Sequence, residues 1–193
     1  MNDRISQQWE VLKRLDAYIG SANTKAGLIL SVSTAAATIT LASYTSLYED
    51  NSNDWVSILR WLVGSMVILC MLLSIWHSFH TIFPNTTPGS TRSLISFVHI
   101  SSYEGGAEAY FNAVADENDN DRLKDLCYQS HILGVITTEK FKSIKKSVKA
   151  LKAGILAGLL LLAMTATSQL HSHFSIENSN KTTSVQTEHG KEA

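Results

Sequence analysis

Three long windows of the chain contain no Asp, Glu, Lys or Arg, and they constrain the fold more than any other feature. The windows are residues 26–48, 61–91 and 153–176. Since about 20 apolar residues cross the hydrocarbon core of a bilayer, each window can hold one transmembrane helix. A buried core helix seldom has more than about 14 uninterrupted apolar residues. The sequence therefore predicts a membrane protein.

The averages over all 193 residues conceal this pattern. A formal charge of -1 and 45% hydrophobic residues would suit an ordinary globular protein. The two cysteines form no disulfide framework, because Cys70 lies inside the second window and Cys127 outside all three. The first apolar run begins only after Lys25, behind a mixed-charge segment, so we expect a retained span and not a cleavable signal.

The fold class that we expect is a mainly α membrane protein with three transmembrane helices. A small, mostly helical cytosolic domain is continuous with the third span. Seven segments follow from the windows and their flanks: a cytosolic amphipathic helix (1–24), transmembrane helix 1 (25–46), a periplasmic loop (47–57), transmembrane helix 2 (58–80), a cytosolic sensing domain (81–151), transmembrane helix 3 (152–171) and a periplasmic disordered tail (172–193).

Residues 121–170 read as one continuous helix that starts in water and enters the membrane. This stretch contains no proline, and its apolar residues recur at helical spacing before the third window begins. Five lysines form a basic collar at the junction: Lys142, Lys145, Lys146, Lys149 and Lys152. Near anionic lipid they set topology by the positive-inside rule, although a phosphate-bearing ligand near Lys140 and Lys142 is an alternative.

The N-terminal 24 residues place apolar side chains on one face of a helix: Ile5, Trp9, Leu12, Leu15 and Ile19. This helix could lie on the membrane surface or pack on protein, and its mixed charge favours packing on protein.

The first span is rich in small and hydroxylated residues between Ser31 and Thr40. Such residues permit close helix packing, which we favour over a polar pathway.

The segment between the second and third spans begins with a break at Pro84, Pro88 and Gly89. Residues 92–103 could form a short strand or a loop, and the second half of 104–115 reads as a helix. The acidic run at 116–121 lacks the glycine of a calcium loop and has Cys127 where the bidentate ligand would stand. We interpret it as an acidic turn and N-cap.

Lys and Arg in the flanks predict the orientation. The N-terminal segment and residues 81–152 are rich in basic residues, whereas the loop 47–57 is acidic and the tail has only Lys181 and Lys191. The positive-inside rule then places the N-terminus and residues 81–152 inside, and the loop 47–57 and the C-terminal tail outside.

Motifs for catalysis or metal binding are missing from the sequence, and we expect neither an enzyme nor a cofactor. His77, His80, His171 and His173 are interpreted as interfacial histidines and not as metal ligands. Gly154 and Gly158 form a GxxxG pair that favours helix association and is the basis for expecting a homo-oligomer.

Three segments resemble bacterial transmembrane Pycsar effectors: DAYIGSANTKAGLIL (16–30), LISFVHISSY (94–103) and QSHILGVITTEKFKSIKKSVKA (129–150). The resemblance covers nearly the whole chain except its C-terminal tail. It implies antiphage defence at the inner membrane. By this resemblance we expect a partner pyrimidine cyclase to make cyclic UMP or cyclic CMP on infection, and the effector then to impair membrane integrity and cause abortive infection. The lipid bilayer is the expected partner surface, and no nucleic acid is expected to bind.

A cyclic pyrimidine nucleotide needs a cation or a helix N-terminus for its phosphate, and a stacking face with polar groups for its base. The residues with this chemistry are Arg92, His99, Tyr103, Gln129, His131 and Lys140. The alternative function is a non-catalytic membrane scaffold that recruits a protein partner through its cytosolic helix. A membrane enzyme would need a buried polar cluster, which the sequence does not reveal.

Overall fold

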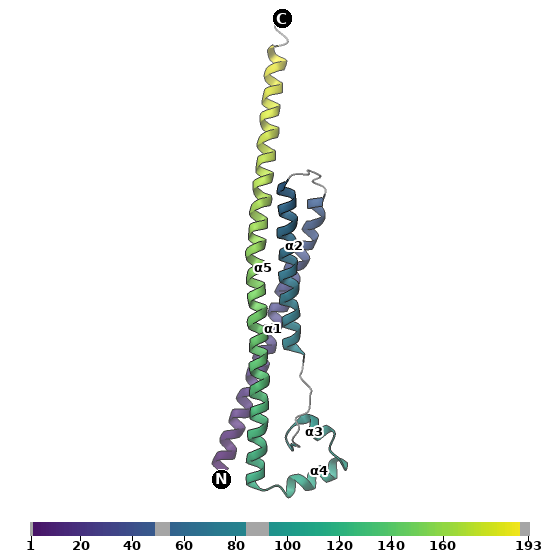
Figure 1. Cartoon of the computed structure of the whole chain (residues 1–193), viewed down its shortest axis with the longest axis vertical. Helices are drawn as coiled ribbons and strands as arrows, with labels where there is room; N and C mark the ends of the chain where they lie inside the picture. The colour runs from purple at the N-terminus through teal and green to yellow at the C-terminus, as the bar shows by residue number, and fades with distance from the viewer. Residues whose placement is uncertain (1, 49–54, 84–92, 190–193) are drawn as a thin grey trace. The chain divides into compact units, whose positions relative to one another are not determined.

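Five helices make up the chain in the structure, a computed structural model that describes residues 2–48, 55–83 and 93–189, with side chains at 3–43, 55–83 and 93–167. They are α1 (Asn2–Tyr48), α2 (Trp55–Ile82), α3 (Phe97–Ser101), α4 (Gly106–Ala115) and α5 (Asp119–His189) (Figure 1). The described residues contain no strand. Three of the helices, α1, α2 and α5, are long and apolar enough to cross a membrane, which confirms the mainly helical fold with three candidate spans.

Two helices continue without a break from a polar part into an apolar part. α1 has 47 residues and joins the expected amphipathic helix to the first span, and α5 has 71 residues and includes the whole predicted stretch 121–170. Neither helix contains a proline, the residue that most strongly interrupts the backbone hydrogen bonds of a helix. The prediction of one continuous helix through 121–170 is confirmed.

The structure differs from two local expectations. The tail 172–193 was expected to be disordered, whereas α5 continues to His189, in a stretch with neither proline nor glycine between Gly158 and Gly190, and residues 190–193 lie outside the described part of the chain. For residues 92–103 we expected a strand or a loop, whereas the described part contains α3. The Ser93 hydroxyl oxygen accepts hydrogen bonds from the backbone N–H groups of Ile95 and Ser96, which closes a turn that an extended strand would not allow.

The acidic run before α5 acts as the helix cap that the sequence predicted. The Asn118 side-chain oxygen accepts a hydrogen bond from the Asp121 backbone N–H at 3.0 Å, and its amide donates to the Asp121 carboxylate at 2.6 Å. Arg122 pairs with Glu117 at 3.0 Å. These contacts satisfy a free N–H group of the first turn and place negative charge at the positive end of the helix dipole.

The chain divides into two compact units: Met1–Thr34 with Leu73–Lys149, and Ala35–Leu72 with Ala150–Ala193. In the first unit, Ala22 and Ala26 of α1 pack with Ile144 of α5 in a small apolar cluster. Gln8 of α1 also donates to the Ser130 hydroxyl of α5 at 2.8 Å. The N-terminal part of α1 therefore packs on protein, as its mixed charge favoured.

The buried positions of α2 recur at alternating intervals of four and three residues. They are residues 60, 64, 67, 71, 74, 78 and 81, and Cys70, beside Met71, is the one buried residue of α2 outside this series. This is the heptad spacing of helices that pack side by side at a shallow angle. Many of these positions carry small or hydroxylated side chains, which allow close backbone approach between membrane helices.

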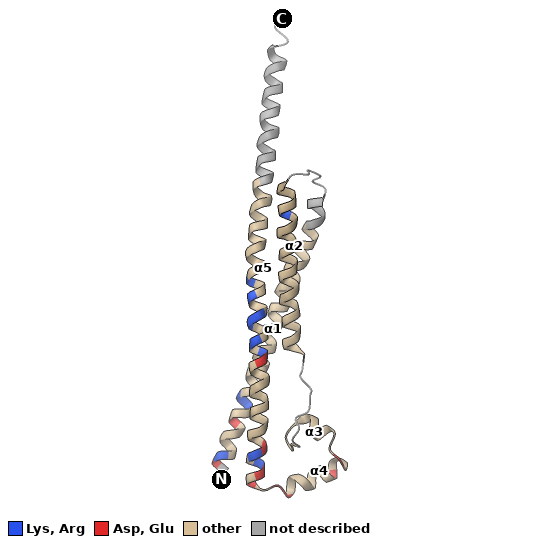
Figure 2. Ribbon diagram, viewed as in Figure 1, with Lys and Arg blue, Asp and Glu red and all other residues tan. Residues whose placement is uncertain are grey.

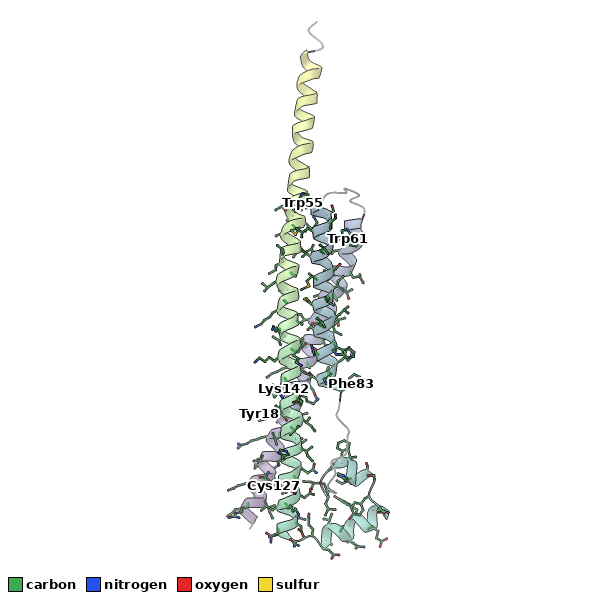
Figure 3. The ribbon with its side chains drawn as sticks, viewed as in Figure 1. Tyr18, Trp55, Trp61, Phe83, Cys127 and Lys142 are labelled. Carbon is green, nitrogen blue, oxygen red and sulfur yellow. The ribbon has the colours of Figure 1, made fainter. Side chains whose placement is uncertain are left out.

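Large apolar side chains point away from the helix contacts. Leu28, Leu62 and Leu156 are each more than 60% exposed, and Trp55 at the start of α2 is 72% exposed (Figure 3). In water such a surface would cause aggregation, but in a bilayer it faces acyl chains at no such cost. The exposed apolar surface agrees with three membrane-spanning helices.

Candidate functional site

A buried lysine is the most distinctive polar group of the first unit. Lys140 of α5 is only 8% exposed. Its ammonium donates to the Asn23 side-chain oxygen of α1 at 2.9 Å and to the Thr81 backbone carbonyl at the end of α2. The lysine thereby joins three helices through two neutral acceptors.

No carboxylate compensates this charge among the residues that the structure describes. Glu139, the preceding residue in the chain, pairs instead with the exposed Lys142 at 2.7 Å. Because burial removes the ammonium from water, it lowers the pKa of Lys140, which stands twelve residues before the third predicted span. A buried ammonium held only by neutral acceptors is a site with unused capacity to bind an anion.

A cavity of about 440 Å³ opens beside Lys140. His80 and Phe83 line it from the end of α2, where Figure 3 labels Phe83. The remaining lining residues lie on α5: Val135, Ile136, Glu139, Lys140 and Ser143. Cavities of about 300–1,000 Å³ that combine apolar walls with a few polar groups are typical small-molecule sites.

A hydroxyl network lies further along the same three helices. The Ser74 hydroxyl of α2 is 2.8 Å from that of Ser33 in α1 and 3.1 Å from that of Ser147 in α5. Ser147 is also 2.8 Å from the Ser78 hydroxyl and donates to the Ser74 backbone carbonyl at 2.8 Å. All four serines are fully buried. Because a buried hydroxyl needs a hydrogen-bond partner, these bonds fix which residues of the three helices face one another.

The predicted ligand residues that the structure describes do not line one common cavity. Lys140 lines the cavity just described, and the exposed His131 lines a separate hollow with Val11 and Leu15 of α1. Gln129 is half-buried on α5. Arg92 lies outside the described residues.

The other two predicted ligand residues belong to the α3 region. His99 is half-buried, and its Nδ1 atom has no hydrogen-bond partner among the described residues. Tyr103 packs edge-to-face on Tyr110 with ring centroids 5.3 Å apart. The Tyr110 hydroxyl in turn donates to the Leu94 carbonyl at 2.7 Å, so these rings hold α4 against the start of the segment.

The two glycines of the GxxxG pair have different surroundings. A Cβ atom added at Gly154 would lie 2.6 Å from Met71 Cε and 3.1 Å from Cys70 Cβ, so α2 packs closely on this glycine. A Cβ atom added at Gly158 would meet nothing within 4 Å. Gly154 thus serves helix packing within the chain, while Gly158 is open.

Metal-ligand clusters are not found among the described residues, where no three His, Cys, Asp or Glu side chains gather. The lysine collar lies on α5, where the ribbon shows a run of residues coloured blue for Lys and Arg (Figure 2). Lys142 and Lys145 in this run are exposed, in contrast to Lys140.

Comparison with known proteins identifies the family to which this chain belongs. The family model described as PycTM, Pycsar effector protein domain, matches residues 7–167. The chain belongs to this Pycsar effector family. It is 32% identical over 158 residues to the Pycsar effector protein EcPycTM of Escherichia coli, across 78% of this chain and 84% of that protein. No solved structure matches the chain. The resemblance found in the sequence is confirmed, and the protein is an antiphage membrane effector.

Sequence reasoning missed several polar residues of this Pycsar effector: Asn23, Ser74, Ser78, Thr81 and Ser147. Their signal is a polar side chain every third or fourth residue along helices that are otherwise apolar, such as 74, 78 and 81 on α2 and 140, 143 and 147 on α5. Such spacing places the polar groups on one face, where they can meet their counterparts on neighbouring helices.

Proposed function

We propose that this effector is activated by a cyclic pyrimidine mononucleotide, cyclic UMP or cyclic CMP, made by a partner pyrimidine cyclase. Activation impairs the integrity of the inner membrane and leads to abortive infection. Membership of the Pycsar effector family supports the signalling role, and the three long apolar helices support action on the bilayer. The protein itself is proposed to act without catalysis and without a resident cofactor.

The continuity of α5 is the structural observation that carries this proposal. One helix includes both the Lys140 site and the third apolar window. A ligand that favours one arrangement of α5 against α1 and α2 therefore acts on an element that also lies in the membrane. The ligand can shift that equilibrium only by the difference between its affinities for the two arrangements.

Topology and assembly complete the proposal. The basic residues of the N-terminal segment and of 81–152 favour a cytoplasmic location, and the acidic loop 47–57 and the tail then lie in the periplasm. We propose a homo-oligomer as the active form, with the open Gly158 as one position where a second copy could approach.

The test is leakage from liposomes that contain a self-quenched dye and the purified full-length protein. Cyclic UMP or cyclic CMP should release the dye, whereas cyclic AMP should not, because a purine differs from a pyrimidine in size and edge groups. Vesicles without protein, treated with the same nucleotides, are the control. Absence of release with every nucleotide would contradict the proposal and favour a scaffold that recruits another protein.

A further inference from the structure

The geometry points to the cavity beside Lys140 as the nucleotide site, with the Lys140 ammonium as the partner of the cyclic phosphate. This inference rests on the proposed function and adds to it the location of the site and the means of coupling. Two of the residues that it assigns, His80 and Phe83, were not among the candidates from the sequence.

Charge is the first argument. A cyclic mononucleotide carries one negative charge on its phosphodiester, and Lys140 is a buried cation held only by the neutral oxygens of Asn23 and Thr81. A phosphate oxygen at the ammonium would supply the missing ionic partner. Charge-assisted hydrogen bonds of this kind are about twice as strong as neutral ones.

Two other hollows in the described part of the chain suit the phosphate less well. One of about 380 Å³ is lined by four carboxylates and by one exposed ammonium, that of Lys124, and this excess of negative charge would repel an anion; the carboxylates are those of Asp116, Glu117, Asp121 and Asp125. The other has His131 as its basic group and is otherwise lined mainly by apolar or small side chains and by Glu139. Neither offers a buried cation.

The cavity walls also carry groups that can stack on a pyrimidine base and form hydrogen bonds with it. The Phe83 side chain is 66% exposed at the cavity, and its ring offers a face on which a pyrimidine can stack. The Glu139 carboxylate can accept a hydrogen bond from uracil N3–H or from the cytosine amino group, and the Ser143 hydroxyl can donate or accept. A volume of about 440 Å³ lies within the range of small-ligand sites.

Nucleotide binding can change the helix contacts because of the hydrogen bonds that Lys140 makes without a ligand. The ammonium has three N–H donors, and two of them now hold α1 and α2 to α5. A phosphate that draws the ammonium into the cavity weakens the link to the Thr81 carbonyl at the end of α2. The nucleotide would thereby favour a state in which the end of α2 is released from α5.

The experiment is a calorimetric titration of purified full-length protein in detergent with cyclic UMP and cyclic CMP. Lys140→Met removes the charge and keeps a similar side-chain length, and we expect it to weaken binding by about ten- to a hundredfold, the range for a lost hydrogen bond to a charged group. Lys140→Arg keeps the charge and should bind more tightly than Lys140→Met. Lys145→Met, at an exposed position of the same helix, should bind as the wild type does.

If Lys140→Met and Lys145→Met bind the nucleotide with equal affinity, the cavity beside Lys140 is not the nucleotide site. The proposed function would still stand in that case, provided that the wild-type protein binds the nucleotide. Absence of binding by the wild type would overturn both. Should Lys140→Met fail to give a monodisperse protein, Phe83→Ala provides the same test at a mostly exposed ring, with weaker binding expected and unchanged binding as the contrary result.

Discussion

Single hydroxyl groups fix how the helices of the first unit face one another. Ser147 contacts the side chains of Ser74 and Ser78 and the Ser74 backbone carbonyl, and all three serines are fully buried. Ser74 and Ser78 lie in the second predicted span, where apolar side chains gain little by leaving the acyl chains for a helix contact. Hydrogen bonds between helices therefore have a larger share in specifying the packing than they have in a soluble core.

Ser147→Ala should lower the free energy of unfolding in detergent micelles by about 1–2 kcal/mol, since interhelical hydrogen bonds contribute about 0.6–1.7 kcal/mol each. Ser31→Ala is the matched control, because the Ser31 hydroxyl is exposed and bonds only within its own helix to the Gly27 carbonyl. The measurement is denaturant unfolding followed by circular dichroism. Equal stability of the two variants would show that the buried network contributes nothing specific.

Close helix packing depends on which glycine of α5 faces α2. Gly154→Val would force its side chain against Cys70 and Met71, and overpacking of this kind costs about 1–3 kcal/mol. Gly158→Val should change the free energy of unfolding by no more than about 0.5 kcal/mol, because an added Cβ atom there meets nothing within 4 Å. Unfolding of both variants in micelles tests this expectation.

The same pair of variants separates packing within a chain from assembly between chains. If a second copy approaches at Gly158, chemical cross-linking of Gly158→Val in membranes should yield fewer oligomers than wild type, even though the isolated chain keeps its stability. Cross-linking at the wild-type level would remove Gly158 from the proposed oligomer contact.

At the scale of the whole molecule, the native cysteines allow a direct measurement of topology. Cys127 is exposed and Cys70 is buried. In intact spheroplasts of cells that express the Cys70→Ser variant, a membrane-impermeant maleimide should leave Cys127 unlabelled, and in inverted vesicles it should label this residue. A variant with Asn51→Cys, and serine at both native cysteines, should give the opposite pattern. Labelling of both positions from the same side would contradict the proposed topology.

The pattern of charge and proline along the chain sufficed to predict the helices, but not which side chains meet between them. Lys140 and Lys142 differ by only two positions, and in sequence both belong to a basic stretch before an apolar window. In the structure one is buried between three helices and the other is exposed. The difference arises from the rotation of α5 against α1 and α2, which depends on contacts between residues more than 50 positions apart.

The buried ammonium also has a consequence for biogenesis. Both of its acceptors, Asn23 and Thr81, are synthesised before Lys140 emerges from the ribosome. The last helix therefore arrives at a pair of earlier helices that already presents the oxygens it needs. A chain shortened at its N-terminus so that it lacks Asn23 would offer this cation only the Thr81 carbonyl, and quality-control proteases would then meet an incompletely docked helix.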